Sequence, residues 1–314
     1  IGALNKGQLN GIAELSPEYA DTIVAKNSLN YRAIIEPNLT AVFFNLSNKP
    51  AVSDTNVRRA LGALNRQDIV NSTLTKTEIV ADSVLMPHQP GYSAQPIKSQ
   101  EEARKILDDA GWKLRSITDS DVEAAKAAKK AEEAGNIVAL GTGQWSMKGN
   151  QGIIISLTAP ETLKSVAEKI ANDWKALGVK VNLKIEKDDV IQSQVIANKN
   201  FEALLFTINI ENGDLYPYWT GGAAGNISSY GNKDVDTWLA EARVTSDSKA
   251  VNERYQKFQS AIANDVPAIP LYWETYVYPQ TKKLKGQSAA IVETPSDRLN
   301  DATLWYFNVR RQFK

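Results

Sequence analysis

The sequence of 314 residues contains no cysteine and a single histidine. Without cysteine there are no disulfides, no thiolate metal sites and no cysteine nucleophiles. The lack of cysteine does not determine the cellular compartment of the protein. The histidine, His88, lies in the proline-bounded loop MPHQPGY, which favours a surface residue over a member of a Ser-His-Asp triad. A zinc site would have only carboxylates as further ligands. We therefore expect no catalytic residues, no metal and no cofactor.

The chain also lacks net charge, because 36 basic residues balance 36 acidic ones. A neutral balance gives no sign of nucleic-acid or anionic-membrane binding, both of which need a basic surface. No stretch approaches the roughly 18 to 20 apolar residues that span a bilayer. The chain starts Ile1-Gly2-Ala3, with neither Met nor a signal peptide, so we interpret it as a processed or truncated piece.

Sequence signatures of catalysis are missing as well. The segment GTGQWSMKG (141–149) does not have the spacing of a GxxxxGK[ST] phosphate loop, and calcium loops of the DxDxDG type are absent. A carboxylate-dependent hydrolase stays an alternative, because no acidic pair can be chosen among 36 acidic residues.

What the chain does contain is the composition of a globular protein, 43% apolar and 23% charged, with an α/β pattern in its middle. Residues 153–157, IIISL, predict a strand, and a helix from Pro160 to Leu177 carries apolar residues on one face. The alternating segment VKVNLKIE (179–186) predicts a second strand, so this unit is a crossover with parallel strands. FEALLFTIN (201–209) adds a third strand.

Other elements are expected on both sides of this unit. Pro37 is expected to end a first strand, YRAIIEP, before a separate buried strand AVFFN at 41–45. The Ala- and Lys-rich segment 119–134 predicts one solvated helix, followed by a glycine-rich hairpin or loop. The remaining expected elements are helices at 16–24, 54–64, 101–110, near 188–198 and in two places within 233–262, and a strand within 266–279.

The loop 211–232, ENGDLYPYWTGGAAGNISSYGN, is the clearest candidate for binding. It brings four aromatic rings together with carboxylates and amides, which are the materials of a small-molecule cleft. It also follows a strand of the α/β sheet, where ligands tend to bind. In the alternative interpretation the rings only plug the edge of the sheet.

Five segments in order resemble one family. The stretch FFNLSNKP leads into a helix with Asp54, Val57, Arg58, Arg59, Ala60 and Leu61, and then Arg66, Ile69 and Val70. The other segments are EEARKILDDAGW, VAEKIANDWKALGVKVNL, YGNKDVDTWLAEA and ERYQKFQSAIANDVPAIPLYW. Together, from about residue 1 to 285, they resemble the family 5 extracellular solute-binding proteins, the oligopeptide- and dipeptide-binding components of ABC importers.

The resemblance implies a lobe of the type II periplasmic-binding-protein kind, an α/β fold with a mixed sheet flanked by helices. Residues 39–271 would form a complete C-terminal lobe, and residues 1–38 and 272–314 would be partial segments of the N-terminal lobe and hinge. Such proteins close two lobes over a ligand without covalent chemistry. They deliver it to a membrane permease from an extracellular or periplasmic location, often through a lipid anchor, which this chain lacks.

The resemblance also assigns roles to residues. The family places an acidic residue, usually Asp in a W-x-x-D context, where this chain has Glu211, without the tryptophan; Asp214 is the alternative carboxylate. Either would pair with a peptide's amino terminus. We expect an aromatic wall of ligand-contacting rings and one amide that bonds the ligand backbone; these residues are Trp219, Tyr230, Trp273 and Asn226. Arg58 and Arg59 are expected to be structural, pairing with carboxylates or helix ends.

Three other functions stay open at this point. Some relatives in the family bind oligosaccharides, which would suit aromatic stacking. A carboxylate-dependent hydrolase would show two carboxylates about 5 to 10 Å apart in a closed pocket. A sensing or adaptor module would show an exposed apolar patch of more than a few hundred Å².

Overall fold

The computed structural model describes residues 2–13, 15, 19, 29–47, 52–73, 76–128, 130–289, 291–292 and 294–307. The helix expected at 16–24 falls outside these residues, with the exception of Tyr19.

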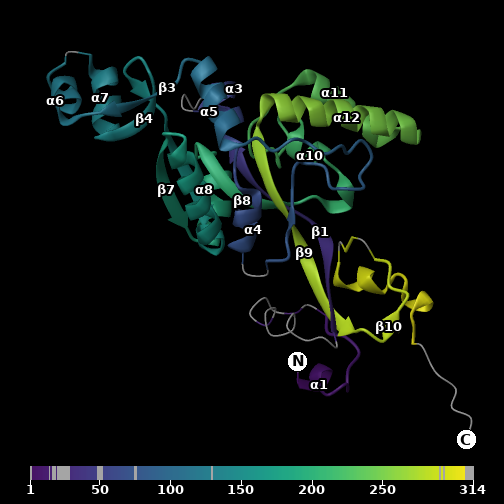
Figure 1. Ribbon diagram of the computed structural model, residues 1–314. Helices are drawn as coiled ribbons and strands as arrows, with labels where there is room; N and C mark the ends of the chain where they lie inside the picture. The colour runs from purple at the N-terminus through teal and green to yellow at the C-terminus, as the bar shows by residue number, and fades with distance from the viewer. Residues whose placement is uncertain are drawn as a thin grey trace, which may run out of the picture.

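A mixed sheet of six strands organises the lobe (Figure 1). The strands β6, β7 and β8 run parallel to one another, whereas β2, β9, β1 and β8 pair antiparallel. In sheet order the strands are β2 (Ile79–Val80), β9 (Ala268–Thr281), β1 (Leu29–Phe44), β8 (Ala203–Asn209), β6 (Ile154–Pro160) and β7 (Lys180–Glu186). The predicted α/β class and the parallel crossover are confirmed.

The crossover forms because its helix has one continuous apolar face. The helix α8 (Lys164–Ala176) follows the short turn η3 (Glu161–Leu163), and its residues Val166, Ile170 and Trp174 are all buried. Trp174 stacks on Phe44 with ring centroids 6.4 Å apart. Gly178 then reverses the chain with φ of +72°, a conformation that favours glycine, and β7 begins.

The expectation that Pro37 ends a strand was wrong. β1 continues through Pro37 to Phe44, and the pairing with β9 shifts register between Ile35 and Leu39. The shift accommodates a residue that has no N–H to give to the ladder. The carbonyl of Pro37 is still used, because it accepts a hydrogen bond from Ile210 N at 2.7 Å.

Helices cover both faces of the sheet, so the lobe is a three-layer sandwich. One core combines Val42, Phe44 and neighbouring strand residues with the helices α3, α4, α5 and α8, and the other combines Phe43 and Leu204 with η4 and the helices α10, α11 and α12. The bounds are α3 (Thr55–Leu61), α4 (Arg66–Asn71), α5 (Gln100–Asp109), α9 (Asp188–Val190), the π-helical turn η4 (Ile191–Ile196), α10 (Tyr216–Trp219), α11 (Lys233–Val244) and α12 (Ser248–Asp265).

The arginine pair of α3 fastens this helix to the end of α12. Arg58 is 5% exposed and donates to the carbonyls of Asp265 and Val266 as well as to those of Val52 and Ser53. Arg59 donates twice to the Asn264 carbonyl. Both cations therefore lie at the negative end of α12, where they satisfy carbonyls that the helix cannot. The expectation that the two arginines are structural is confirmed.

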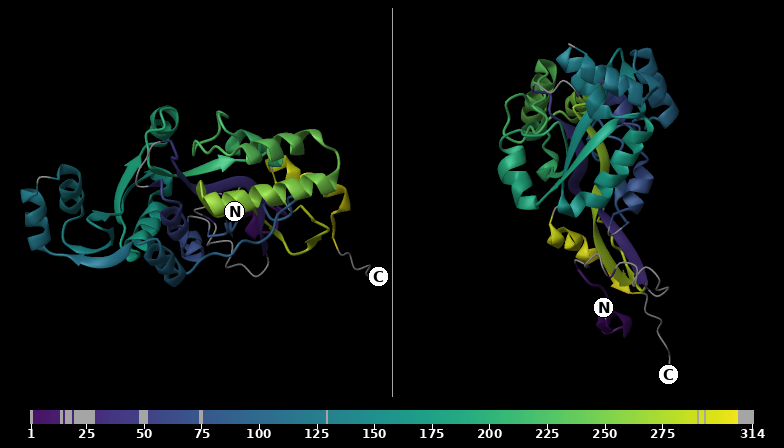
Figure 2. Two further views of the ribbon diagram at one scale, coloured as in Figure 1. Left: turned by 90° about the horizontal axis from the view of Figure 1, so that it is seen from above. Right: turned by 90° about the vertical axis from the view of Figure 1, so that its left-hand side faces the viewer.

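A small separate unit extends from one side of the lobe (Figure 2). It consists of a three-stranded antiparallel sheet and two helices around Ile117, Ile137, Leu140 and Met147. The bounds are β3 (Lys113–Ile117), α6 (Asp119–Ala127), α7 (Ala131–Leu140), β4 (Gly143–Lys148) and β5 (Gln151–Gly152).

The prediction of one solvated helix at 119–134 was therefore wrong. The chain turns at Ala128, whose ψ of 143° is extended, because residues on both sides of the turn, Ala125 and Ile137, have to cover the same small sheet. The hairpin or loop expected over residues 136–152 is confirmed for its later part by the pairing of β4 with β5, whereas residues 136–140 belong to α7.

The long strands β1 and β9 leave the sheet together and run into the part of the molecule that holds both termini (Figures 1 and 2). There Leu29–Ile35 pair with Thr275–Thr281, and Ile34, Tyr276, Tyr278 and Val292 form a small core. The elements of this part are α1 (Gly2–Asn5), β10 (Leu284–Lys285), η6 (Pro295–Leu299), η7 (Ala302–Leu304) and β11 (Tyr306–Phe307). The domain boundaries at residues 38 and 272 stay a prediction.

Replacing Arg58 with Met tests the fastening of α3 to α12. The change leaves the buried carbonyl of Val52 and three part-buried carbonyls without their donor, so we expect the free energy of unfolding to fall by roughly 3 kcal/mol in urea titrations. Arg59→Met is the control, because it removes bonds to a single exposed carbonyl and should cost about 1 kcal/mol or less. Equal losses in the two variants would show that Arg58 has no special place.

Candidate ligand-binding cleft

A cleft opens at the carboxyl ends of the parallel strands. β6, β7 and β8 all end there, and β1 and β9 cross the same edge on their way out of the lobe. The cleft encloses about 540 Å³, which lies within the range of roughly 300 to 1,000 Å³ for ligand pockets. It is the position at which open α/β sheets bind ligands.

The lining of this cleft is acidic and rich in hydroxyl groups. Carboxylates come from Glu36 of β1, Glu78 before β2, Asp188 after β7 and Glu274 of β9. Among the described residues that line the cleft, none is Lys or Arg. The hydroxyl and amide groups are those of Thr73, Thr162, Ser165, Gln192, Thr207, Tyr272 and Thr275. The cleft is therefore built to attract a cation and to exchange hydrogen bonds with a polar ligand.

Glu274 is a cleft carboxylate whose pKa is raised by its surroundings. Burial raises the pKa of Glu274, the nearby carboxylate of Glu78 raises it further, and hydrogen bonds from Asn38 and Thr207 oppose the rise. The Asn38 amide donates to Glu274 Oε2 at 3.1 Å. A cation next to Glu274 would stabilise its charged form, so this side chain is poised to receive one.

Hydroxyl pairs hold the strands in register behind the carboxylates. The hydroxyls of Thr40 and Thr207 lie 2.7 Å apart across β1 and β8. The burial of the Tyr272 phenol raises its pKa well above the ordinary range. The floor of the cleft is therefore uncharged, and its charge is confined to the four carboxylates.

The predicted aromatic wall lies inside the protein. Trp219 is fully buried and packs on Phe43 with ring centroids 6.2 Å apart, while Trp273 is 1% exposed. Tyr230 is buried, and its hydroxyl donates to Asp265 Oδ2 at 2.6 Å. In this conformation none of the three rings offers a face to the cleft, so contact with ligand stays a prediction that their burial does not favour.

The amide of Asn226 ties the loop 211–232 to itself. Its Nδ2 donates to the carbonyls of Thr220 at 2.9 Å and Tyr230 at 2.8 Å, and its Oδ1 accepts from Tyr230 N at 3.1 Å. The amide is buried and these bonds occupy it, which gives Asn226 a structural role in the conformation described.

The two predicted carboxylates lie just beyond β8. Asp214 caps Tyr216 N and pairs with Arg243 at 3.2 Å, so its charge already has a partner. The backbone of Glu211 begins the turn η5 (Glu211–Gly213) directly after Ile210, whose N–H bonds Pro37. The side chain of Glu211 lies outside the described part of the chain. Its pairing with a ligand stays a prediction.

Sequence reasoning missed the carboxylates of the cleft. Glu36 and Glu274 each interrupt a strand of otherwise mostly apolar residues, in IIEP and LYWETY, and that interruption was the available signal. A charged side chain inside such a strand has to be satisfied or exposed at a site. Glu78 and Asp188 carry no comparable signal, because both precede or follow strands in polar surroundings.

Comparison with known proteins now assigns the family. Residues 1–228 match the bacterial extracellular solute-binding proteins, family 5 Middle. The chain belongs to this family. Relatives in the family are binding proteins, which supports a binding role and not an enzymatic one.

Two curated relatives and one solved structure extend the comparison. The oligopeptide-binding protein AppA of Bacillus subtilis (strain 168) is 22% identical over 298 residues, 91% of this chain and 50% of AppA. The glutathione-binding protein GsiB of Shigella flexneri serotype 5b (strain 8401) is 25% identical over 280 residues, 84% of this chain and 48% of GsiB. AppA from Bacillus subtilis in complex with a nonapeptide shares the fold with a TM-score of 0.65 at 21% identity, over 98% of this chain and 58% of that chain.

The chain thus spans about half the length of the curated relatives that it matches. The family is extracellular by description. Within the described residues, no helix combines the length and the apolar character that crossing a bilayer requires.

The raised pKa of Glu274 makes the stability of the protein depend on pH. Between the ordinary carboxyl value and the raised value, the folded state binds more protons than the unfolded chain, so stability falls as pH rises. Glu274→Gln removes this titration and keeps an oxygen for Asn38. We expect the variant to be more stable at pH 7, with the two unfolding curves converging as the pH falls towards the ordinary value.

Urea unfolding at pH 4 to 8, in steps of about one pH unit, measures this difference in the free energy of unfolding. Glu132→Gln, an exposed change on α7, should follow the parent protein throughout. A Gln variant that is less stable than the parent at pH 7 would contradict the assignment.

Proposed function

We propose that this chain supplies one lobe and the hinge strands of an extracytoplasmic protein that captures oligopeptides or dipeptides for the permease of an ABC transporter. A lipid anchor outside this chain would hold the protein at the membrane. The observation that carries the proposal is the acidic cleft at the carboxyl ends of β6, β7 and β8. It lies where β1 and β9 leave the lobe, so a second lobe attached to these strands would close over it.

The chemistry of the cleft suits the charged amino terminus of a peptide. An ammonium ion brought next to Glu274 relieves the cost of burying that carboxylate, provided that the geometry is good. The hydroxyls around it exchange hydrogen bonds directly or through water with backbone groups, which allows different peptide sequences to bind. Glu211, placed at the end of β8, is the second carboxylate that we propose for the ammonium ion.

The oligosaccharide alternative loses the observation that favoured it. Stacking on a sugar needs an exposed ring face, and of the four rings in loop 211–232 Trp219 and Tyr230 are at most 4% exposed. The other two, Tyr216 and Tyr218, are half-buried and do not line the cleft. A hydrolase is disfavoured by the membership of a family of binding proteins.

Calorimetry with the full-length protein tests the proposal. A short peptide should bind at least tenfold more tightly than the same peptide with an acetylated amino terminus, because only the free ammonium pairs with a carboxylate. Glu274→Gln and Glu211→Ala should each lower the affinity for the free peptide and leave the affinity for the acetylated peptide unchanged. Affinity for the free peptide should also rise with pH through the raised pKa of Glu274, because only the ionised carboxyl attracts the ammonium.

The exposed change Glu132→Gln is the control for these variants and should bind both peptides as the parent does. Equal affinity for free and acetylated peptides would overturn the ammonium assignment, and an absence of binding by any peptide would overturn the proposed function.

A second expectation concerns the 314-residue chain alone. A ligand that is normally enclosed by two lobes would keep about half of its contacts on one lobe, so affinity should fall to about millimolar or weaker. Titration of the chain with a short peptide, followed by calorimetry or ligand-observed NMR, measures this. Micromolar binding by this chain would show that it forms a complete site.

A further inference from the structure

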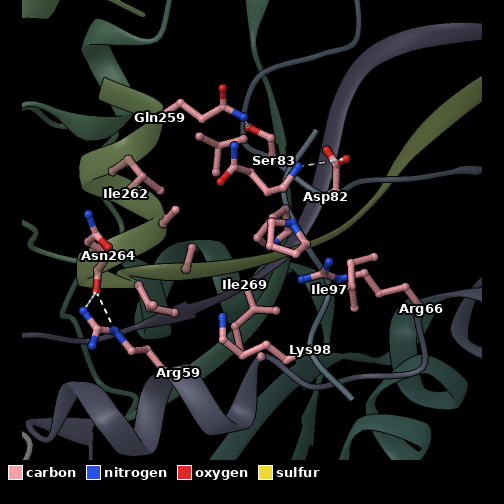
Figure 3. A pocket seen from close by; sticks show the side chains of 18 residues that line it. Arg59, Arg66, Asp82, Ser83, Ile97, Lys98, Gln259, Ile262, Asn264 and Ile269 are labelled. Carbon is pink, nitrogen blue, oxygen red and sulfur yellow. Dashed lines mark hydrogen bonds between the residues drawn. The ribbon is translucent and has the colours of Figure 1, made fainter. Parts of the chain in front are cut away.

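A second cavity lies at the amino end of β9, away from the acidic cleft (Figure 3). It encloses about 260 Å³ between α3, α12 and residues 93–98, a segment that we call the strap. The cavity borders Ala268, Ile269 and Pro270, the first residues of β9, whereas β2 pairs further along at Tyr272 and Trp273. It shares no lining residue with the acidic cleft, so a ligand bound in it would be independent of the proposed function.

The side chain of Arg66 lines this cavity. Arg66 is 7% exposed, and its Nε is buried with no hydrogen-bond acceptor among the described residues. Burial lowers the pKa of Arg66 to about 10, which leaves it charged at neutral pH. A buried cation that no carboxylate contacts is costly, so the surroundings should provide an anion or water.

Asp82 is the nearby carboxylate, and its oxygens already have donors. The hydroxyl of Tyr92 donates to Oδ1 at 3.2 Å and to Oδ2 at 3.1 Å, and Gln95 N donates to Oδ2 at 3.3 Å. These bonds attach the strap to the lobe. Asp82 therefore raises the pKa of Arg66 only through space and does not form an ion pair with it.

Two further cations surround the same space. Lys98 stands on the strap and is half-exposed, and Arg59 lies across the cavity, bonded to the carbonyl of Asn264 (Figure 3). Three positive side chains thus line the cavity against the single carboxylate of Asp82. This charge is opposite to that of the acidic cleft.

The rest of the wall is apolar. Ile97 of the strap is 40% exposed, and Ile262 of α12 and Ile269 of β9 line the same space. The strap is held on both sides of the cavity, because Gln259 bonds both backbone groups of Ser93 and Ser99 caps α5. The cavity therefore combines positive side chains with a short hydrocarbon lining. Its volume is just below the range for drug-sized ligands, which restricts it to small molecules.

We propose that this cavity binds a small organic monocarboxylate, with the carboxylate on Arg66 and Lys98 and a short branched hydrocarbon against Ile97, Ile262 and Ile269. The planar guanidinium presents two N–H groups that match the two oxygens of a carboxylate. An inorganic oxyanion would satisfy the charge but would leave the apolar half without a partner. A neutral apolar molecule would fill the volume and leave Arg66 unpaired.

Isothermal titration of the 314-residue chain with isovalerate, isovaleramide and inorganic phosphate, at constant ionic strength, tests the proposal. We expect isovalerate to bind with a Kd of about a millimolar or tighter, and at least tenfold more tightly than the uncharged isovaleramide or phosphate. Arg66→Met should lower the affinity for isovalerate at least tenfold. In the absence of ligand it should leave the Tm unchanged or raised, because it removes an unpaired buried charge.

Lys98→Ala changes a half-exposed residue, so it provides a second test if the Arg66 variant does not fold. It should lower the affinity for isovalerate several-fold. Arg115→Met removes a cation of β3 that does not line the cavity and should bind as the parent does. Equal binding of isovalerate and isovaleramide, tighter binding of phosphate than of isovalerate, undiminished binding by Arg66→Met or Lys98→Ala, or no binding of isovalerate would each overturn the proposal.

Discussion

The antiparallel pairing of β1 with β9 is the constraint on which the rest of the molecule depends. These two strands are neighbours in the sheet, contribute residues to both of its cores, and continue together into the part that holds both termini. Glu36, Tyr272 and Glu274 of the cleft all stand on them. Any change in their register would therefore move the cleft carboxylates relative to the ends of β6 and β8.

Buried side chains of opposite charge lie near two different points of β9. Near the amino end of β9 the protein buries Arg66 of α4, which no carboxylate of the described residues contacts, and in the middle of β9 it half-buries Glu274 next to Glu78. Burial disfavours the charged form of both groups, which lowers the pKa of Arg66 and raises that of Glu274. The two cavities are therefore lined by charge of opposite sign.

Much of the fold was readable from the sequence, whereas the site was readable only in part. The crossover 153–186 shows its helical and alternating periods directly, and the structural use of Arg58 and Arg59 followed from their helix. The role of the loop 211–232 could not be decided from the sequence, because the same aromatic residues can line a cleft or fill the core. In the structure Trp219 fills the core. The cleft carboxylates come from four separated segments that only the strand order brings together, which no local pattern encodes. The break at Ala128 likewise depends on a small sheet that lies on either side of it in sequence.

The small unit formed by β3, β4, β5, α6 and α7 enters and leaves the lobe at neighbouring points. Lys113 pairs with Met147, and Met147 pairs with Gly152, so the entry and exit strands lie two strand spacings apart, about 10 Å. Three or four extended residues would bridge that gap. The unit has its own core, but Ser146 of β4 bonds Gly178 and Leu177 of the lobe, and Lys180 of β7 bonds the end of α7. Shortening or replacing the unit would therefore have to supply new partners for these few groups, at one edge of the sheet.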